Sequence, residues 1–151
     1  MLTSQMRDLI ATHTIGLVAT VTPDGFPAVS PKGTFLIHDD RTVAFSNIRS
    51  PGTIRNIAAN PAVEINFIDV FHRTACRIRG TAQARSAAEI PADLHARFVD
   101  KWPQLAGMMR GFVMIDILDA KFIRSPSYDI GLEADGLARH WLQHYTDLLS
   151  G

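Results

Sequence analysis

The sequence has little that would point to a secreted, membrane-bound or nucleic-acid-binding protein. Its one cysteine, Cys76, cannot form an internal disulfide, which is typical of the reducing cytosol, so a cytoplasmic location is expected. The 15 basic and 15 acidic residues balance, which excludes a global attraction to polyanions and means that any anion site must be local. No apolar run approaches the roughly 20 residues of a membrane span. The N-terminal segment carries Arg7 and Asp8, unlike a signal peptide.

What the chain does contain is enough apolar sequence for one core. With 151 residues, of which 46% are hydrophobic, it can bury most of its unfolded surface without a covalent staple. No internal repeat or low-complexity linker interrupts it. These features predict a single domain over residues 1–151.

Alternating and β-branched segments predict a mainly antiparallel sheet. Short polar turns separate the first such segments, so hairpins are expected over 15–31 and 34–47. Further strands are predicted at 62–69, 73–86 and 112–125. About six strands need their edges hidden, and closure into a β-barrel with peripheral helices is the usual solution. A nucleotide-binding βαβ fold is disfavoured, because no G-x-G-x-x-G follows the first strand.

Capping residues and apolar periodicity predict four helices outside this sheet. The first begins after Thr3 or Ser4, and the second begins at Ser50 with Pro51 in its first turn. A Ser86–Glu89 capping box predicts a third helix from about Ala87 to Val99. The segment 136–149 is expected to form an amphipathic terminal helix.

Two polar segments are suited to an anion. In "SPKGT", Ser30, Lys32 and Thr34 alternate and so share one side of the chain, while Gly33 allows close approach of the backbone. The predicted helix start at Ser50 to Thr53 offers free N–H groups and the positive end of a helix dipole. A solvated barrel rim with ordinary turn and capping residues would explain the same pattern.

The strand 73–86 places Arg77 and Arg79 on one face and Cys76, Ile78 and Gly80 on the other. The arginines could form a cationic wall or an outward face that carries solubilising charge. Nucleic-acid binding is disfavoured, because no aromatic residues for base stacking are interleaved with them. Cys76 is expected to be a small core residue.

No sequence motif indicates a metal site or a side-chain nucleophile. His140 and His144 share one helix face, but without further ligands they favour an ordinary helix surface. No G-x-S-x-G or comparable motif is present. If the protein is an enzyme, a cofactor is expected to carry the chemistry.

Four segments in order resemble the pyridoxamine 5′-phosphate oxidase-related FMN-binding split-barrel family: "LVATVTPDGFPAVSPKGTF", "AFSN", "SPGTIRNIAANPAVEINF" and "CRIRGTA". The resemblance implies an antiparallel split β-barrel and a homodimer with FMN at the subunit interface. It implies that FMN is held by three segments and one strand residue. These are Ser30, Pro31, Lys32, Gly33 and Thr34; Phe45, Ser46 and Asn47; Ser50, Gly52 and Thr53; and Arg77.

The chain departs from true pyridoxamine 5′-phosphate oxidases, which carry basic residues at the positions of Ser30, Gly52 and Thr53. Lys32, with Arg49 or Arg55, would supply the charge instead. The C-terminal arginine- and histidine-bearing segment that binds the substrate phosphate is also missing, so vitamin B6 oxidation is not expected.

The resemblance predicts an FMN-dependent oxidoreductase that passes electrons from a reduced nicotinamide or organic donor to a small acceptor or oxygen. The alternatives are a non-catalytic flavin, deazaflavin or haem carrier or sensor on the same barrel, and a nucleic-acid-binding barrel. The irregular segment 100–111, with Trp102, Met108 and Met109, is interpreted as a variable lid or a dimer contact.

Overall fold

The computed structural model describes residues 1–151 and contains seven β-strands and four α-helices. The strands are β1 Gly16–Val21, β2 Pro27–Lys32, β3 Phe35–Ile37, β4 Thr42–Ser46, β5 Ala62–Asp69, β6 Thr74–Arg85 and β7 Phe112–Arg124. The helices are α1 Ser4–Thr12, α2 Pro51–Ala59, α3 Ala92–Lys101 and α4 Ala134–Ser150. None of these helices is both long and apolar enough to span a bilayer.

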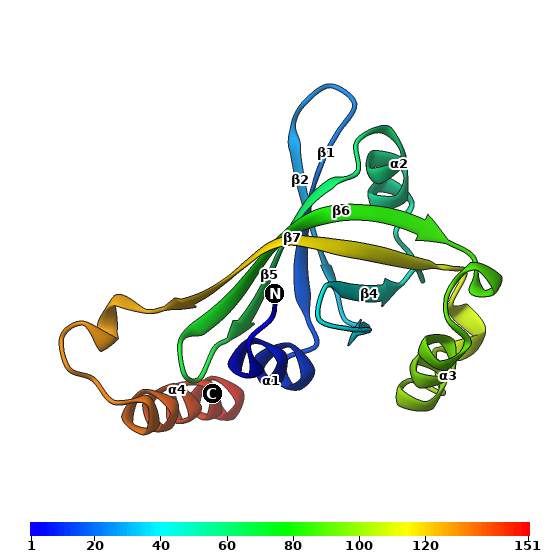
Figure 1. Cartoon of the computed structure of the whole chain (residues 1–151). Helices are drawn as coiled ribbons and strands as arrows, with labels where there is room; N and C mark the ends of the chain where they lie inside the picture. Colours follow the sequence, from blue (N-terminus) through cyan, green and yellow to red (C-terminus); the bar gives the residue numbers. More distant parts are fainter.

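All seven strands form one antiparallel sheet in the order β2-β1-β5-β6-β7-β4-β3. The sheet curls around a core, with α1 at its open end and α2 beside β6 (Figure 1). Only Gly33 and Thr34 separate the two terminal strands of this order, β2 and β3. The predicted antiparallel split barrel with peripheral helices is confirmed.

Side-chain alternation fills this core as the sequence predicts. The inner face of the sheet carries Val18, Ile65 and Ile78, each at most 1% exposed. Cys76 lies on the same face, and burial raises the pKa of its thiol to about 11. Arg77 points to the opposite, outer face. The expectation that Cys76 is a small core residue is therefore confirmed.

Helix α1 packs its Met6, Leu9 and Ile10 against the barrel, and Thr3 Oγ1 caps it by accepting from Met6 N at 3.3 Å. Helix α3 covers the outer face of β3 and β4 with a second apolar cluster that contains Leu94 and Phe98. Strand β4 is therefore buried on both of its faces.

The single helix predicted from Ala87 to Val99 is wrong in its first turn. The Ser86–Glu89 capping box does form, but it starts a short 3₁₀ helix that ends at Glu89. Ile90 is extended, with ψ 156°, because Pro91 disfavours helical backbone in the residue before it. Helix α3 then begins at Ala92.

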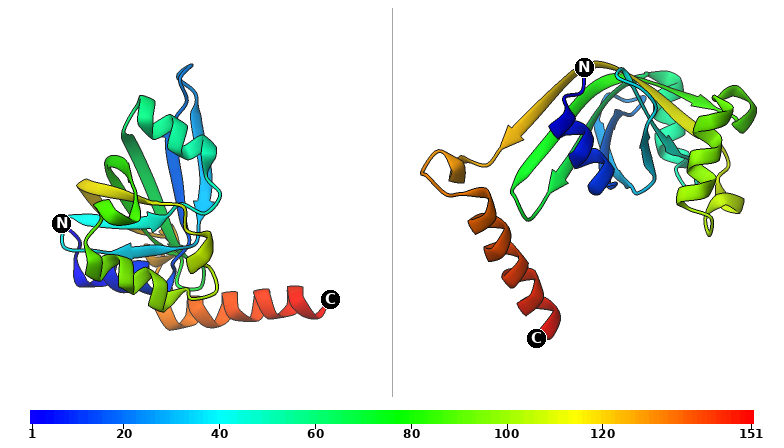
Figure 2. Two further views of the ribbon diagram at one scale, coloured as in Figure 1. Left: turned by 90° about the vertical axis from the view of Figure 1, so that its right-hand side faces the viewer. Right: turned by 60° about the horizontal axis from the view of Figure 1, so that its bottom comes forward.

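Helix α4 projects away from the barrel at the far end of β7 (Figure 2). Its buried side chain is Leu137, so most of the amphipathic face predicted for residues 136–149 is not packed against this chain. Two aromatic contacts connect it to the β5–β6 turn: Arg73 lies 4.0 Å over the Trp141 ring, and the Tyr145 and Phe71 rings are 5.9 Å apart.

We predict that Gly80→Ala destabilises the fold by about 1–3 kcal/mol, the usual cost of overpacking. A Cβ at this position would overlap the Asp116 carbonyl oxygen and lie 2.9 Å from Ile115 Cγ2. Urea unfolding would measure the change. The matched control is Gly107→Ala, whose Cβ meets nothing within 4 Å; equal losses in the two variants would contradict the packing argument.

Candidate functional site

The rim of the barrel between β2 and α2 brings together several of the predicted site residues. Because Ser30 pairs with Val18 and Lys32 with Gly16, both side chains lie on the inner side of the sheet. Helix α2 crosses there, and Thr53 Oγ1 lies 3.2 Å from Ser30 Oγ. Pro31 alternates to the outer face and is exposed. The predicted segments around Ser30 and Thr53 are therefore neighbours in space.

Lys32 is a cation without a counterion in this setting. It is half-buried, and no carboxylate forms an ion pair with it. Burial lowers the pKa of its ammonium group, because desolvation disfavours the charged form. The neighbouring Gly33 has open space where a side chain would begin. An anion placed beside Lys32 would stabilise the charged ammonium group, which burial disfavours.

A second pair of predicted residues closes the inner end of the rim. Thr34 Oγ1 and Ser46 Oγ are 2.6 Å apart and both residues are buried. Phe45 lies wholly in the core, where its ring is 5.2 Å from that of Phe35. Only the backbone of Phe45 can therefore contact a ligand.

Asn47 is held by the segment before β7. Its N–H donates to Gly111 O at 2.8 Å, and its carbonyl accepts from Arg110 N at 2.9 Å. No hydrogen bond engages its side chain. The amide group therefore remains free for a ligand.

The start of α2 differs from the sequence expectation in one respect. Ser50 occupies the N-cap position, but its hydroxyl makes no capping hydrogen bond. The residue is only 7% exposed. Next to it, Gly52 leaves the first turn uncovered, since a Cβ there would have only Arg55 Nη2 within 4 Å, at 3.9 Å. Space therefore remains beside Gly52 for an anion to approach the first turn of α2.

Arg77 does not join these residues within one chain. It projects from the outer face of β6, where its Nε is 4.0 Å from Glu64 Oε1. Arg79 pairs with the same carboxylate at 3.4 Å. The cationic wall considered from the sequence therefore lies on the opposite side of the sheet from Ser30 and Lys32.

The structure adds a residue that sequence reasoning missed, Arg110. It lines an open cavity of about 740 Å³ together with Asn47, Ser50, Arg49 and others. The connection between α3 and β7, which lies within the segment 100–111, forms one wall of this cavity. No sequence motif indicates that the backbone of Asn47 pairs with this connection, so the sequence could not reveal the position of Arg110.

No group of three or more histidine, cysteine or acidic side chains is arranged to hold a metal ion. The rings of His140 and His144 instead lie edge-on to Trp141, at centroid distances of 5.2 and 5.3 Å.

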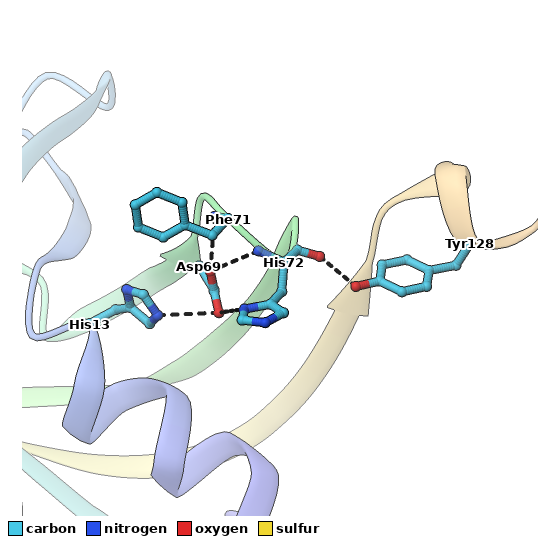
Figure 3. A network of polar contacts seen from close by, with 5 residues as sticks. All are labelled: His13, Asp69, Phe71, His72 and Tyr128. Carbon is cyan, nitrogen blue, oxygen red and sulfur yellow. Dashed lines mark hydrogen bonds and ion pairs between the residues drawn. The ribbon is translucent and has the colours of Figure 1, made fainter. Parts of the chain in front are cut away.

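A separate polar network lies at the β5–β6 turn, around the carboxylate of Asp69 (Figure 3). Asp69 Oδ1 accepts from the N–H groups of Phe71 and His72, both at 2.9 Å. Its Oδ2 lies 2.7 Å from His72 Nδ1 and 3.2 Å from His13 Nε2, at the end of α1. The Tyr128 hydroxyl donates to His72 O at 2.6 Å. The Asp69 carboxylate thus connects α1 with the turn, and Tyr128 connects the segment before α4 to the same turn.

Burial alone would raise the pKa of Asp69. The hydrogen bonds from the His72 backbone and ring, with the nearby His13, outweigh burial and lower the pKa below its usual value. The charged form of Asp69 is therefore the form that stabilises the fold.

Comparison with known proteins identifies relatives of this architecture. The family model for pyridoxamine 5′-phosphate oxidase matches residues 2–122, whereas a comparison with curated proteins gave no match. HupZ from Group A Streptococcus is 26% identical with a TM-score of 0.71, covering 83% of this chain and 96% of that chain. An F420 reductase is 22% identical with a TM-score of 0.63, and the match covers 80% of this chain and 98% of that chain. An FMN-binding protein from Syntrophomonas wolfei is 11% identical with a TM-score of 0.67, and the match covers 80% of this chain and 84% of that chain. At these identities, the reductase and the FMN-binding protein show a shared fold alone.

We predict that Asp69→Asn lowers the free energy of unfolding at pH 7 by about 1.5–3 kcal/mol, the range for hydrogen bonds to a charged group. Because the folded-state pKa is depressed, this stabilisation is complete above the unfolded-state pKa of about 3.9 and is lost as the pH falls through the folded-state value. Urea unfolding of both proteins between pH 7 and pH 3 should show their stabilities converging in acid.

The control for this variant is Asp100→Asn, an exposed position on α3 that should change stability little at any pH. A gap between wild type and Asp69→Asn that stays constant across the whole pH range would contradict the assignment.

Proposed function

The chain belongs to the pyridoxamine 5′-phosphate oxidase family, and we propose that it is an FMN-dependent oxidoreductase that holds FMN at the rim between β2 and α2. The observation that carries this proposal is the half-buried, counterion-free Lys32 on the same face of β2 as Ser30, whose hydroxyl contacts that of Thr53. A flavin phosphate would supply the missing counterion of Lys32 and would accept hydrogen bonds from the two hydroxyls.

The donor set fits FMN in three further ways. Ser30, Thr53 and the free first turn of α2 offer neutral hydrogen-bond donors for phosphate oxygens. The space beside Gly33 allows the backbone to approach a planar ring. Asn47 has an unengaged side-chain amide at the end of β4, where Ser46 closes the site.

When bound, FMN would supply the hydride chemistry, accepting from a reduced nicotinamide or organic donor and passing electrons to a small acceptor or oxygen. The chain's own contribution is to bind, orient and partly shield the flavin. The proposed reaction is not pyridoxamine phosphate oxidation, because Gly52 and Thr53 replace basic residues of true oxidases.

A homodimer with FMN at the subunit interface is part of the same proposal. The outer face of β1, β2 and β5 exposes Leu17, Val29 and Ile68, with Val29 at 63%. On that face Asn66 Oδ1 is buried without a hydrogen-bond partner, which a second subunit could provide. Arg77 lies on this same outer face, opposite Asn66 in the pairing of β5 with β6.

The alternative is a non-catalytic carrier or sensor of flavin, deazaflavin or haem on the same barrel. An FMN-binding protein from Syntrophomonas wolfei, which shares the fold, supports this alternative. Steady-state oxidation of reduced nicotinamide by the flavin-loaded protein separates the two: turnover supports the oxidoreductase, and flavin binding without turnover supports the carrier.

We predict that Lys32→Ala weakens FMN binding about tenfold to a hundredfold, the loss expected for one charged hydrogen bond. Riboflavin lacks the phosphate, so its weaker affinity should change little and the preference for FMN should shrink. Fluorescence titration of flavin-free protein with each flavin would measure both constants.

The matched control is Arg79→Ala, which removes a cation from the outer face where Glu64 already neutralises it. If Arg79→Ala abolishes FMN binding while Lys32→Ala leaves it intact, the flavin does not lie along β2.

We predict that the protein sediments as a dimer and that Val29→Glu shifts it to monomer, since the substitution would bury an unpaired carboxylate in the interface. Stoichiometric FMN binding should be lost with the dimer. Ala96→Glu, which adds the same charge to an exposed position on α3, is the control. A monomer that still holds one FMN per chain would rule out a shared site.

A further inference from the structure

Helix α4 has an apolar face that the chain covers only in part. Contacts of Trp141 and Tyr145 with the β5–β6 turn hold the first part of the helix. The helix then runs away from the barrel (Figure 2). Leu142, Leu148 and Leu149, here called the leucine face, are all more than half exposed, with Leu149 at 90%. Together with Tyr145 they follow the i, i+3, i+7 spacing of one helix side.

This helix depends on packing for its stability. It has 17 residues, close to the length at which an isolated helix is marginal in water, and most helices in proteins are stabilised by packing. Its N-cap residue, Glu133, makes no side-chain capping hydrogen bond, and no basic residue lies in its last turn. The leucine face therefore needs a cover that the chain itself does not provide.

A groove of suitable chemistry lies on the outer face of the sheet, between the end of α1 and strands β1 and β5. Its volume is about 440 Å³. No lysine, arginine, aspartate or glutamate lines it, and its apolar lining residues are Ile15, Leu17, Ile68 and Val70. Ile15 is 61% exposed. An uncharged apolar groove of this kind suits the apolar face of an amphipathic helix.

Asn66 gives the same groove a polar requirement. Its side-chain oxygen makes no hydrogen bond within the chain, whereas buried amide oxygens are normally paired. Asn66 lines the groove, so a half-turn of the amide, which exchanges its oxygen and nitrogen, can offer the oxygen to a donor there. A protein surface can supply such a donor, and the hydrocarbon chains of a lipid cannot.

The fold indicates a second copy of this chain as the occupant. The chain's own α4 leads away from the barrel (Figure 2), and folding it back would cost its contacts with the β5–β6 turn. The groove belongs to the face proposed for the homodimer, since Leu17 and Ile68 lie on both. It ends at Val70, next to Phe71, which contacts Tyr145 of α4. Each α4 therefore leaves the barrel at the margin of this face, where a symmetric partner would lie.

We propose that α4 is exchanged between two copies of this chain, with the leucine face of each helix packed into the groove between α1, β1 and β5 of the other. The proposal rests on the proposed homodimer and not on the flavin. Helix α4 lies beyond residues 2–122, which the family model matches, so the exchange is a feature of this chain's own C-terminal segment.

Sedimentation over a dilution series tests the exchange with the double variant Leu142→Lys, Leu149→Lys. Lysine is a good helix former, so far-UV circular dichroism should show that α4 persists. The dimer dissociation constant should rise about tenfold or more, because both leucines lose their burial. The matched control, Gln143→Lys with Ser150→Lys, adds the same charges at the same spacing to the exposed polar side and should leave the constant within about twofold.

Cross-linking identifies the occupant of the groove. The double variant Ile15→Cys, Leu149→Cys, treated with a short bismaleimide, should give a covalent dimer, and neither single variant should. Cys76 is buried, so the wild-type chain should not react and serves as the blank. A covalently closed monomer would place the chain's own α4 in the groove, and a covalent dimer of Leu149→Cys alone would pair helix with helix; either result overturns the exchange.

A dimer that the leucine substitutions leave unchanged, or that gives no cross-link, would overturn the exchange while the proposed dimer stands. A wild-type chain that remains monomeric at every concentration would overturn the exchange and the proposed shared flavin site together. If the protein takes up no flavin, the proposed function fails, and the same two measurements on flavin-free protein still decide whether α4 is exchanged.

Discussion

The pairing register of β2 with β1 is the constraint on which the rim depends. With Ser30 opposite Val18 and Lys32 opposite Gly16, a hydroxyl and a cation lie on the side of the sheet that elsewhere holds the core. A slip of one residue would exchange them for Val29 and Pro31 and remove every polar group that β2 offers. The turn at Asp24-Gly25, with Gly25 at φ 88°, sets this register.

Helix α2 makes that placement tolerable. It covers the polar end of the first hairpin with its own polar side, so that Thr53 meets Ser30 and Asn56 Nδ2 donates to Thr20 Oγ1 at 3.0 Å. These bonds satisfy groups that would otherwise be costly to bury. The other side of the same helix faces the arginine-lined cavity. One short helix therefore borders uncharged polar contacts on one side and a positively charged cavity on the other.

The sequence predicted the strands well because alternation is a local property, and it placed Cys76 and Arg77 on their correct faces. It misjudged the third helix, where the constraint from Pro91 on Ile90 overrode the capping box. The features that it could not reveal depend on residues distant in the chain. Arg110 reaches the cavity through backbone pairing with Asn47, and Asp69 meets His13 only because α1 returns to the β5–β6 turn.

The register shift opposite Arg79 and Gly80 divides β7 into two unlike halves. Residues Phe112–Asp116 pair with β4 as well as β6, whereas beyond Leu118 only β6 remains as a partner. The far half of β7 therefore presents an open strand edge, the kind of surface on which other chains can add strands. Lys121 and Arg124 lie exposed along it, and charged side chains and bulges at a strand edge disfavour the addition of further strands. Replacing those two charged residues would therefore lower the solubility of the protein more than the stability of its fold.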